Sequence, residues 1–158
     1  MNKKIIVFFS YTNHTRIVAN KIKNELNCDV LEIEPLVPYS NDYNEVVRIE
    51  KNNTNDIQIK KIDIDLSKYD EIILGFPVWW YVPATPIRTF LKLNDLRGKI
   101  IKPFATNAGW LGESFEIIKK LCPNAKIDNG MNIVYSEDYK ENKLITDINE
   151  IDEWIKAL

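Results

Sequence analysis

Residues 5–15 of the chain read IIVFFSYTNHT, and this stretch decides the fold. Its first half, Ile5 to Phe9, is a continuous apolar run, which is typical of a strand buried on both faces of a parallel sheet. Further along, Val18, Ile22 and Leu26 recur every four residues, which predicts one face of a helix. The stretch therefore predicts a buried strand that leads directly into a helix.

Three hydroxyl side chains follow the apolar run, at Ser10, Thr12 and Thr15, with Asn13 and His14 between them. The first backbone N–H groups of a helix have no acceptor within the helix, and the helix dipole favours negative charge there. Hydroxyls and free N–H groups at this junction predict an anion site, with phosphate as the obvious ligand. One alternative is that the hydroxyls only cap the helix. A second is that His14 is a solvated loop residue instead of a phosphate contact.

Known nucleotide-binding motifs narrow the choice of ligand. The loop lacks the Gly-Lys-Ser/Thr of a Walker motif, and the chain has no Gly-x-Gly-x-x-Gly fingerprint. A mononucleotide therefore fits better than ATP or NAD.

The composition restricts the class of protein. With 158 residues, 45% of them hydrophobic, the chain is expected to form one domain over residues 1–158. A net charge of −2 offers no basic surface for nucleic acid, and no apolar run is long enough to span a membrane. The basic start MNKK leads into the first strand and is not read as a secretion signal, so we expect a cytoplasmic location. Cys28 and Cys122 form no metal-ligand pattern.

Strands and helices alternate along the rest of the chain. Strands are predicted at 3–9, 29–33, 71–76, 99–106 and 131–135; helices are predicted at 15–26, from about 86, at 113–121 and from about 147 to 158. This alternation predicts an α/β fold, a doubly wound five-stranded parallel sheet with helices on both faces. Residues 35–57 form a long excursion between strands two and three, with a short helix expected near 42–51 and extended chain over 57–66.

Two further loops at the same edge of the predicted sheet are rich in aromatic residues. Ligands of open parallel sheets bind beyond the carboxyl ends of the strands. The loop after the third strand contains Pro77, Val78, Trp79, Trp80 and Tyr81. The loop after the fourth contains Thr106, Asn107, Ala108, Gly109, Trp110 and Gly112. A ligand with a phosphate at one end and a flat aromatic system at the other would satisfy all three loops.

The chain resembles flavodoxins and flavodoxin-like FMN proteins over nearly its whole length. The resemblance lies in Ser10-x-Thr12-x-x-Thr15, in Gly75-Phe76-Pro77-Val78-Trp79-Trp80 and in Pro103-Phe104-Ala105-Thr106-Asn107-Ala108-Gly109. It implies the strand order 2-1-3-4-5 and FMN as the cofactor. The chain departs from many family members in the third loop, where Asn107-Ala108-Gly109-Trp110 replaces a Gly or Ser-Gly-Gly run. The excursion is closer to that of family members whose Pro-Tyr-Ser-x-Asp-Tyr segment, here 38–43, folds over the site.

The resemblance also assigns roles to the three loops. The phosphate is expected at the backbone N–H groups and side chains of the first loop, and the ring beside Trp79, Trp80, Trp110 or Tyr81. Main-chain groups of residues 78–80 and 107–110 are expected to bond the polar edge of the ring. Trp79 and Trp80 have core or interface packing as an alternative role, and Trp110 has a surface position.

Three functions remain open at this point. The first is an FMN-binding electron carrier that engages redox partner proteins transiently, with no catalytic side chain. The second is an NAD(P)H-dependent reductase of quinones or similar small acceptors, with Tyr39, Tyr43 and Trp110 shaping the acceptor pocket. The third is a binding or regulatory module that has lost its flavin.

Overall fold

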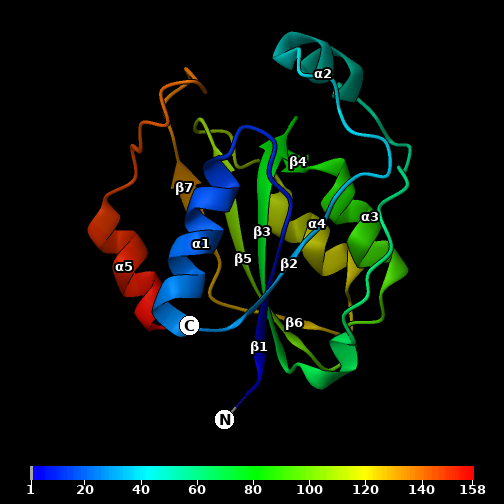
Figure 1. Ribbon diagram of the computed structural model, residues 1–158, viewed down its shortest axis with the longest axis vertical. Helices are drawn as coiled ribbons and strands as arrows, with labels where there is room; N and C mark the ends of the chain where they lie inside the picture. Colours follow the sequence, from blue (N-terminus) through cyan, green and yellow to red (C-terminus); the bar gives the residue numbers. More distant parts are fainter. Residues whose placement is uncertain (1) are drawn as a thin grey trace.

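A parallel sheet forms the centre of the computed structural model, which describes residues 2–158 (Figure 1). Its strands are β1 (Lys4–Phe8), β2 (Asp29–Glu32), β3 (Glu71–Trp79), β4 (Val82–Pro83), β5 (Ile100–Asn107), β6 (Lys126–Ile127) and β7 (Met131–Val134). The helices are α1 (His14–Leu26), α2 (Tyr43–Glu50), α3 (Thr85–Leu93), α4 (Ser114–Leu121) and α5 (Ile148–Lys156), with a 3-10 turn, η1 (Leu66–Lys68). The predicted α/β class is confirmed.

The strand order is β2-β1-β3-β5, and these four strands are parallel. The next position is shared by two short strands, because β6 pairs with the start of β5 and β7 pairs with its end. This agrees with the predicted order 2-1-3-4-5, with the fifth strand divided in two. The two-residue strand β4, which pairs antiparallel with the end of β3, was not predicted.

Helices cover both faces of the sheet, and the alternation of side chains along each strand divides the core in two (Figure 1). Ile6, Ile73 and Phe104 pack with residues of α1 and α5. Ile72 and Leu74 pack on the opposite face with residues of α3 and α4. No helix among residues 2–158 is both long and apolar enough to cross a bilayer.

The excursion between β2 and β3 places α2 above the carboxyl ends of the strands (Figure 1). Its two legs are joined by a bridge between Pro35 and Ile59, and Lys60 N donates to Glu34 O at 2.8 Å. The predicted helix near 42–51 is confirmed as α2. The stretch predicted as extended at 57–66 pairs with no sheet strand beyond this bridge, and Ile59, Ile62 and Ile64 pack against the core on the side of α3.

The amino ends of β3 and β5 carry a buried ion pair. Lys102 Nζ lies 3.2 Å from Glu71 Oε2, and the two side chains are 11% and 7% exposed. Lys102 also donates to Leu158 O at 3.0 Å, and Lys4 contacts both Glu71 and Leu158 O. Burial raises the pKa of Glu71. The hydrogen bonds and charges of Asn2, Lys102 and Lys4 lower it by more than burial raises it, so that the pKa lies below its usual value. The charges at this end of the sheet therefore compensate one another, although Glu71 Oε2 makes no hydrogen bond among residues 2–158.

Candidate functional site

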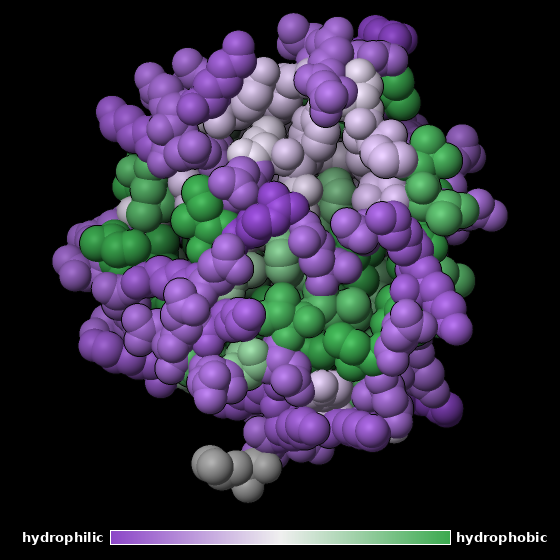
Figure 2. All heavy atoms as spheres, in the orientation of Figure 1, coloured by the Kyte–Doolittle hydropathy of each residue, from purple (hydrophilic) through white to green (hydrophobic). Residues whose placement is uncertain are grey.

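A cavity of about 160 Å³ opens at the carboxyl ends of β1, β3, β5 and β7, and we call it the edge cavity. Its lining is uncharged except for Glu137, and Figure 2 shows pale, near-neutral side chains gathered over this end of the molecule. The lining consists of Tyr11, Thr12, His14, Tyr43, Pro77, Val78, Trp79, Thr106, Asn107, Ala108, Trp110, Tyr135, Ser136, Glu137 and Tyr139.

The amino end of α1 adjoins this cavity, and its N-cap residue makes no capping bond; in its first turn, Ser10 Oγ accepts only the N–H of Arg16. This N-cap residue, Asn13, adopts a left-handed conformation with φ 78°. The ends of α2 and α5 differ, because Asp42 and Asp147 accept N–H groups of the first turn there. A left-handed residue directly before a helix turns successive N–H groups to one side, which is the geometry of an anion nest. The first turn of α1 also contains no acidic residue, so a negative ligand meets no repulsion from it.

The three predicted hydroxyls are placed differently. Thr12 lines the edge cavity and a second, more open cavity of about 430 Å³ that Asn13 also lines. Ser10 Oγ accepts the N–H of Arg16 at 3.2 Å, and the buried Thr15 hydroxyl bonds Thr106 at 2.7 Å. Thr12 is therefore the one hydroxyl of the three that faces a cavity, while Ser10 and Thr15 hold the loop in place.

His14 is buried at the wall of the edge cavity and is not a solvated loop residue. Its exposed fraction is 7%, and its ring stacks on Tyr135 with centroids 4.0 Å apart. Its Nε2 atom is buried and has no hydrogen-bond partner among residues 2–158. Burial lowers the pKa of His14, and Asn142 and the main chain of Tyr139 offset this in part. A neutral imidazole with a free nitrogen thus faces the site.

The predicted strand end at 76 is too early, since β3 runs to Trp79, and the aromatic side chains at its end and in the turn that follows divide into an inner and an outer group. Trp79 lies inside, edge-on to Phe9, Tyr11 and Tyr39 at centroid distances of 5.5, 5.9 and 5.1 Å. Trp80 points outward and donates its indole N–H to Val47 O at 2.8 Å. Both tryptophans thus have a packing role. Trp79 packs inward and also lines the edge cavity, whereas Trp80 contacts α2.

The loop after β5 is braced by its own side chains. Asn107 Oδ1 accepts the N–H groups of Gly109 and Trp110 at 2.8 and 2.9 Å, so these two are not free for a ring edge. Trp110 is 61% exposed and lies edge-on to Tyr81. A Cβ on Gly112, which has φ 58°, would lie 2.4 Å from Tyr81 O, so the two loops touch through a glycine.

The structure brings nine of the sixteen predicted residues to the edge cavity: Thr12, His14, Pro77, Val78, Trp79, Thr106, Asn107, Ala108 and Trp110. Asn13 lines the neighbouring open cavity, and Trp80 lines a third cavity beneath α2. The remaining five, which line none of these three cavities, are Ser10, Thr15, Tyr81, Gly109 and Gly112.

Sequence reasoning missed the loop after β7 and Tyr11, and it placed Tyr43 only in the acceptor pocket of the reductase hypothesis. Tyr135, Ser136, Glu137 and Tyr139 line the edge cavity from that loop. Tyr43 of α2 stacks on Tyr139 at 4.0 Å and faces Tyr11 at 6.3 Å. The available signal was position alone, since a loop at the carboxyl end of the fifth strand belongs to the same edge of the sheet.

Comparison with known proteins places the chain in a family. A family model described as flavodoxin matches residues 3–155. A candidate flavoprotein of Bacteroides eggerthii is 28% identical, with a TM-score of 0.80 and 99% and 98% of the two chains covered. A flavoprotein of Lactobacillus acidophilus in complex with FMN is 24% identical, with a TM-score of 0.74 and 98% and 99% covered, and shows the shared fold. No curated protein matches. The chain belongs to the flavodoxin family.

Proposed function

We propose that this protein binds FMN at the edge cavity and carries electrons between redox partner proteins. The observation that carries the proposal is the amino end of α1, whose N-cap residue makes no capping bond, beside a cavity lined by aromatic rings and by one charged side chain, Glu137. Family membership and the FMN complex of the Lactobacillus flavoprotein support the choice of this mononucleotide.

The residues present fit the cofactor on two counts. The N–H groups around Asn13, together with the Thr12 hydroxyl, form a cradle for a phosphate dianion. The buried Nε2 of His14 lacks a partner, and a hydroxyl or phosphate oxygen of the ligand would supply one. Burial lowers the pKa of His14, so its ring contributes a hydrogen bond without a charge at neutral pH.

FMN, when bound, supplies the capacity to accept and release electrons. The chain's own residues bind its phosphate, flank its ring and exclude water from part of it. Trp80, Tyr81 and Trp110 are 39%, 51% and 61% exposed and form an aromatic rim beside the cavity. Such a rim suits a brief encounter with a redox partner, because aromatic side chains give contact area at little entropic cost.

The phosphate assignment is tested by comparing FMN with riboflavin, which lacks the phosphate. Thr12→Asp places a negative charge at the cradle and is expected to weaken FMN at least about tenfold. The affinity for riboflavin should change by less than about twofold in this variant. The control Asn20→Asp, at an exposed position further along α1, should change the affinity for neither ligand. Titration followed by flavin fluorescence measures both affinities. Equal weakening of FMN and riboflavin would contradict the assigned cradle.

A reductase of small acceptors is the second candidate, and the cavity beneath α2 favours it. That cavity adjoins the edge cavity and shares Tyr11, Tyr43, Val78 and Trp79 with it. Oxidation of NADPH by the FMN-loaded protein with a quinone as acceptor would support the reductase over the carrier. Turnover only through an added redox protein would support the carrier.

A further inference from the structure

The edge cavity and the neighbouring open cavity share a boundary that consists largely of tyrosine rings. Four residues line both cavities, namely Tyr11, Thr12, Tyr43 and Tyr139. The three rings follow one another, since Tyr43 stacks on Tyr139 at 4.0 Å and 11° and faces Tyr11 at 6.3 Å and 19°. They come from three separate segments of the chain, which are the loop after β1, the start of α2 and the loop after β7.

FMN would have to span this boundary if it binds as proposed above. The edge cavity measures about 160 Å³, which is well below the roughly 300 Å³ of the smallest pockets for ligands of drug size. Asn13, at the phosphate cradle, lines the open cavity of about 430 Å³ and not the edge cavity. A ligand with its ring in the first cavity and its phosphate at the cradle therefore has to pass the stack of Tyr43 and Tyr139.

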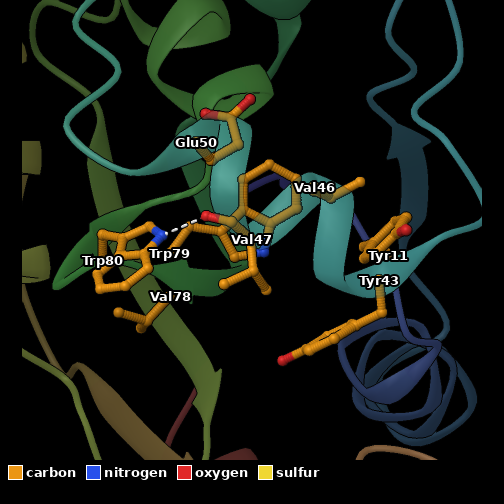
Figure 3. A pocket seen from close by; sticks show the side chains of 8 residues that line it. All are labelled: Tyr11, Tyr43, Val46, Val47, Glu50, Val78, Trp79 and Trp80. Atoms are coloured by element: carbon orange, nitrogen blue, oxygen red, sulfur yellow. Dashed lines mark hydrogen bonds between the residues drawn. The ribbon is translucent and has the colours of Figure 1, made fainter.

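Tyr43 stands on the fixed side of this stack, because α2 is tied to the rest of the protein by hydrogen bonds. Val47 O, within α2, accepts the indole N–H of Trp80 at 2.8 Å, drawn as a dashed line in Figure 3. Ser40 O, just before α2, accepts the hydroxyl of Tyr11 at 2.5 Å, and Figure 3 shows Tyr11 beside Tyr43. The start of α2 is thus held independently of Tyr139.

Tyr139 lies in a loop whose own hydrogen bond closes it at the base, where Ser136 N donates to Lys143 O at 2.8 Å. Within residues 137–143, every residue except Tyr139 is exposed. The imidazole of His14 faces the Tyr139 main chain from beneath, but its Nε2 makes no hydrogen bond among residues 2–158. The Tyr139 ring is therefore the side chain that packs this loop against α2, and the stack can part while the bond at the base of the loop stays intact.

We propose that Tyr43 and Tyr139 form a gate through which FMN enters and leaves, and that the loop of Tyr139 is the part that moves. A stacked aromatic pair favours the closed arrangement by a factor of about 2 to 10, which slows the passage of a ligand without preventing it. The passage of FMN rests on the proposed function, whereas the hold of Tyr139 on its loop can be measured without any ligand.

The first test removes the ring that moves. Tyr139→Ala is expected to raise both the association and the dissociation rate constant of FMN about fivefold. Loss of a simple contact with bound FMN would raise only the dissociation rate constant, so the association rate constant identifies the gate. Tyr139→Phe restores the ring and should restore both rate constants. The matched control Lys143→Ala, at an exposed position of the same loop that lines neither cavity, should leave both within about twofold. Stopped-flow flavin fluorescence measures these rate constants.

A second variant tests the gate from the side of α2. Tyr43→Ala should also raise the association rate constant about fivefold, and combining it with Tyr139→Ala should add no further increase, because both rings act through one stack. The proposal is overturned if the association rate constant is unchanged in both single variants, or if their effects multiply.

Proteolysis of the protein without flavin separates failure of the gate from failure of FMN binding. Trypsin cleaves after Lys140 at a rate that follows the open population of the loop, so Tyr139→Ala should speed this cleavage about fivefold and Tyr139→Phe should not. Should FMN fail to bind while cleavage changes as expected, the proposed function is lost and the moving loop stands. Unchanged cleavage in Tyr139→Ala would show that the ring does not hold the loop, and would overturn the gate.

Discussion

At the amino ends of β3 and β5, Lys102 and Glu71 neutralise each other inside the protein. At the carboxyl ends, the N-cap residue of α1 makes no capping bond and His14 Nε2 has no partner among residues 2–158. Unpaired buried polar groups are costly, and native proteins keep few of them. The contrast teaches that one end of the sheet is complete in its charge pairs, although Glu71 Oε2 makes no hydrogen bond among residues 2–158, whereas the other end offers an imidazole nitrogen and backbone N–H groups to something that the chain does not supply.

The largest expected effect comes from breaking the complete end. Lys102→Met leaves Glu71 buried without its main partner, and should lower the free energy of unfolding by about 3–5 kcal/mol. The matched control is Lys126→Met, whose pair with Asp128 is exposed and should contribute within about 0.5 kcal/mol. Urea unfolding measures both variants. Adding Glu71→Leu to Lys102→Met should recover most of the loss, and a further large loss would contradict this account.

Adding the missing ligand sharpens the comparison from the other end. At a free FMN concentration 100 times its Kd, the free energy of unfolding should rise by about 2.7 kcal/mol. Lys102→Met should gain the same increment, because the two ends do not share partners. Thermal unfolding with and without FMN, with affinities measured separately, checks both values. Both proteins are compared at that same FMN concentration, and a smaller gain in the variant would mean that its affinity for FMN has fallen and that the two ends are coupled.

Helix caps give a smaller and local contrast. Asp42→Ala removes the side chain that accepts Asn44 N and Glu45 N, and should cost α2 about 1 kcal/mol. Asn13→Gly at α1 removes no capping bond and suits φ 78°, so it should change stability by less than about 0.5 kcal/mol. Hydrogen exchange of the two helices separates these effects. A loss at α1 as large as that at α2 would show that Asn13 caps its helix after all.

The smallest effect is expected in the pH dependence of His14. Its folded pKa lies below the unfolded value of 6.5, so the unfolded chain binds a proton that the folded protein resists. Stability of the FMN-free protein should therefore fall as the pH drops below about 6.5, and His14→Phe, which keeps a ring against Tyr135, should lose this part of the slope. Unfolding curves between about pH 5 and pH 8 measure the difference. A difference that is flat, or that has the opposite sign, would refute the assignment.

Much of the fold could be predicted because apolar runs and helical spacing are local signals. The buried strand at Ile72–Leu74 and the short helix α2 are examples. Strand β6 was not predicted, because two residues are too few to show an alternation of apolar and polar side chains. The position predicted for the fifth strand is therefore shared by β6 and β7. The pattern at 57–66 predicted extended chain, and whether such chain joins the sheet depends on its tertiary position, which here gives it one bridge, at Ile59.

The candidate site was predictable in outline but not in its hydrogen bonds. The three loops were found because their side chains are unusual for the ends of strands. That the Thr15 hydroxyl is taken by Thr106, 91 residues away, depends on a contact no local pattern encodes. The stack of Tyr43 on Tyr139 is equally non-local: Tyr43 ends the Pro-Tyr-Ser-x-Asp-Tyr segment, but Tyr139 belongs to no recognisable motif. Which predicted residues contact a ligand remains a prediction until the ligand titrations are made.

The contact at Gly112 has a mechanical consequence. Glu113 N donates to Tyr81 O at 2.9 Å, and a Cβ at residue 112 would collide with Tyr81 itself. This hydrogen bond and close contact join the turn after β3, where Trp80 and Tyr81 both have positive φ, to the segment that begins α4. The turn after β3 and the loop after β5 are therefore expected to move together, although they lie some thirty residues apart in the sequence. A side chain at position 112 would push the two segments apart.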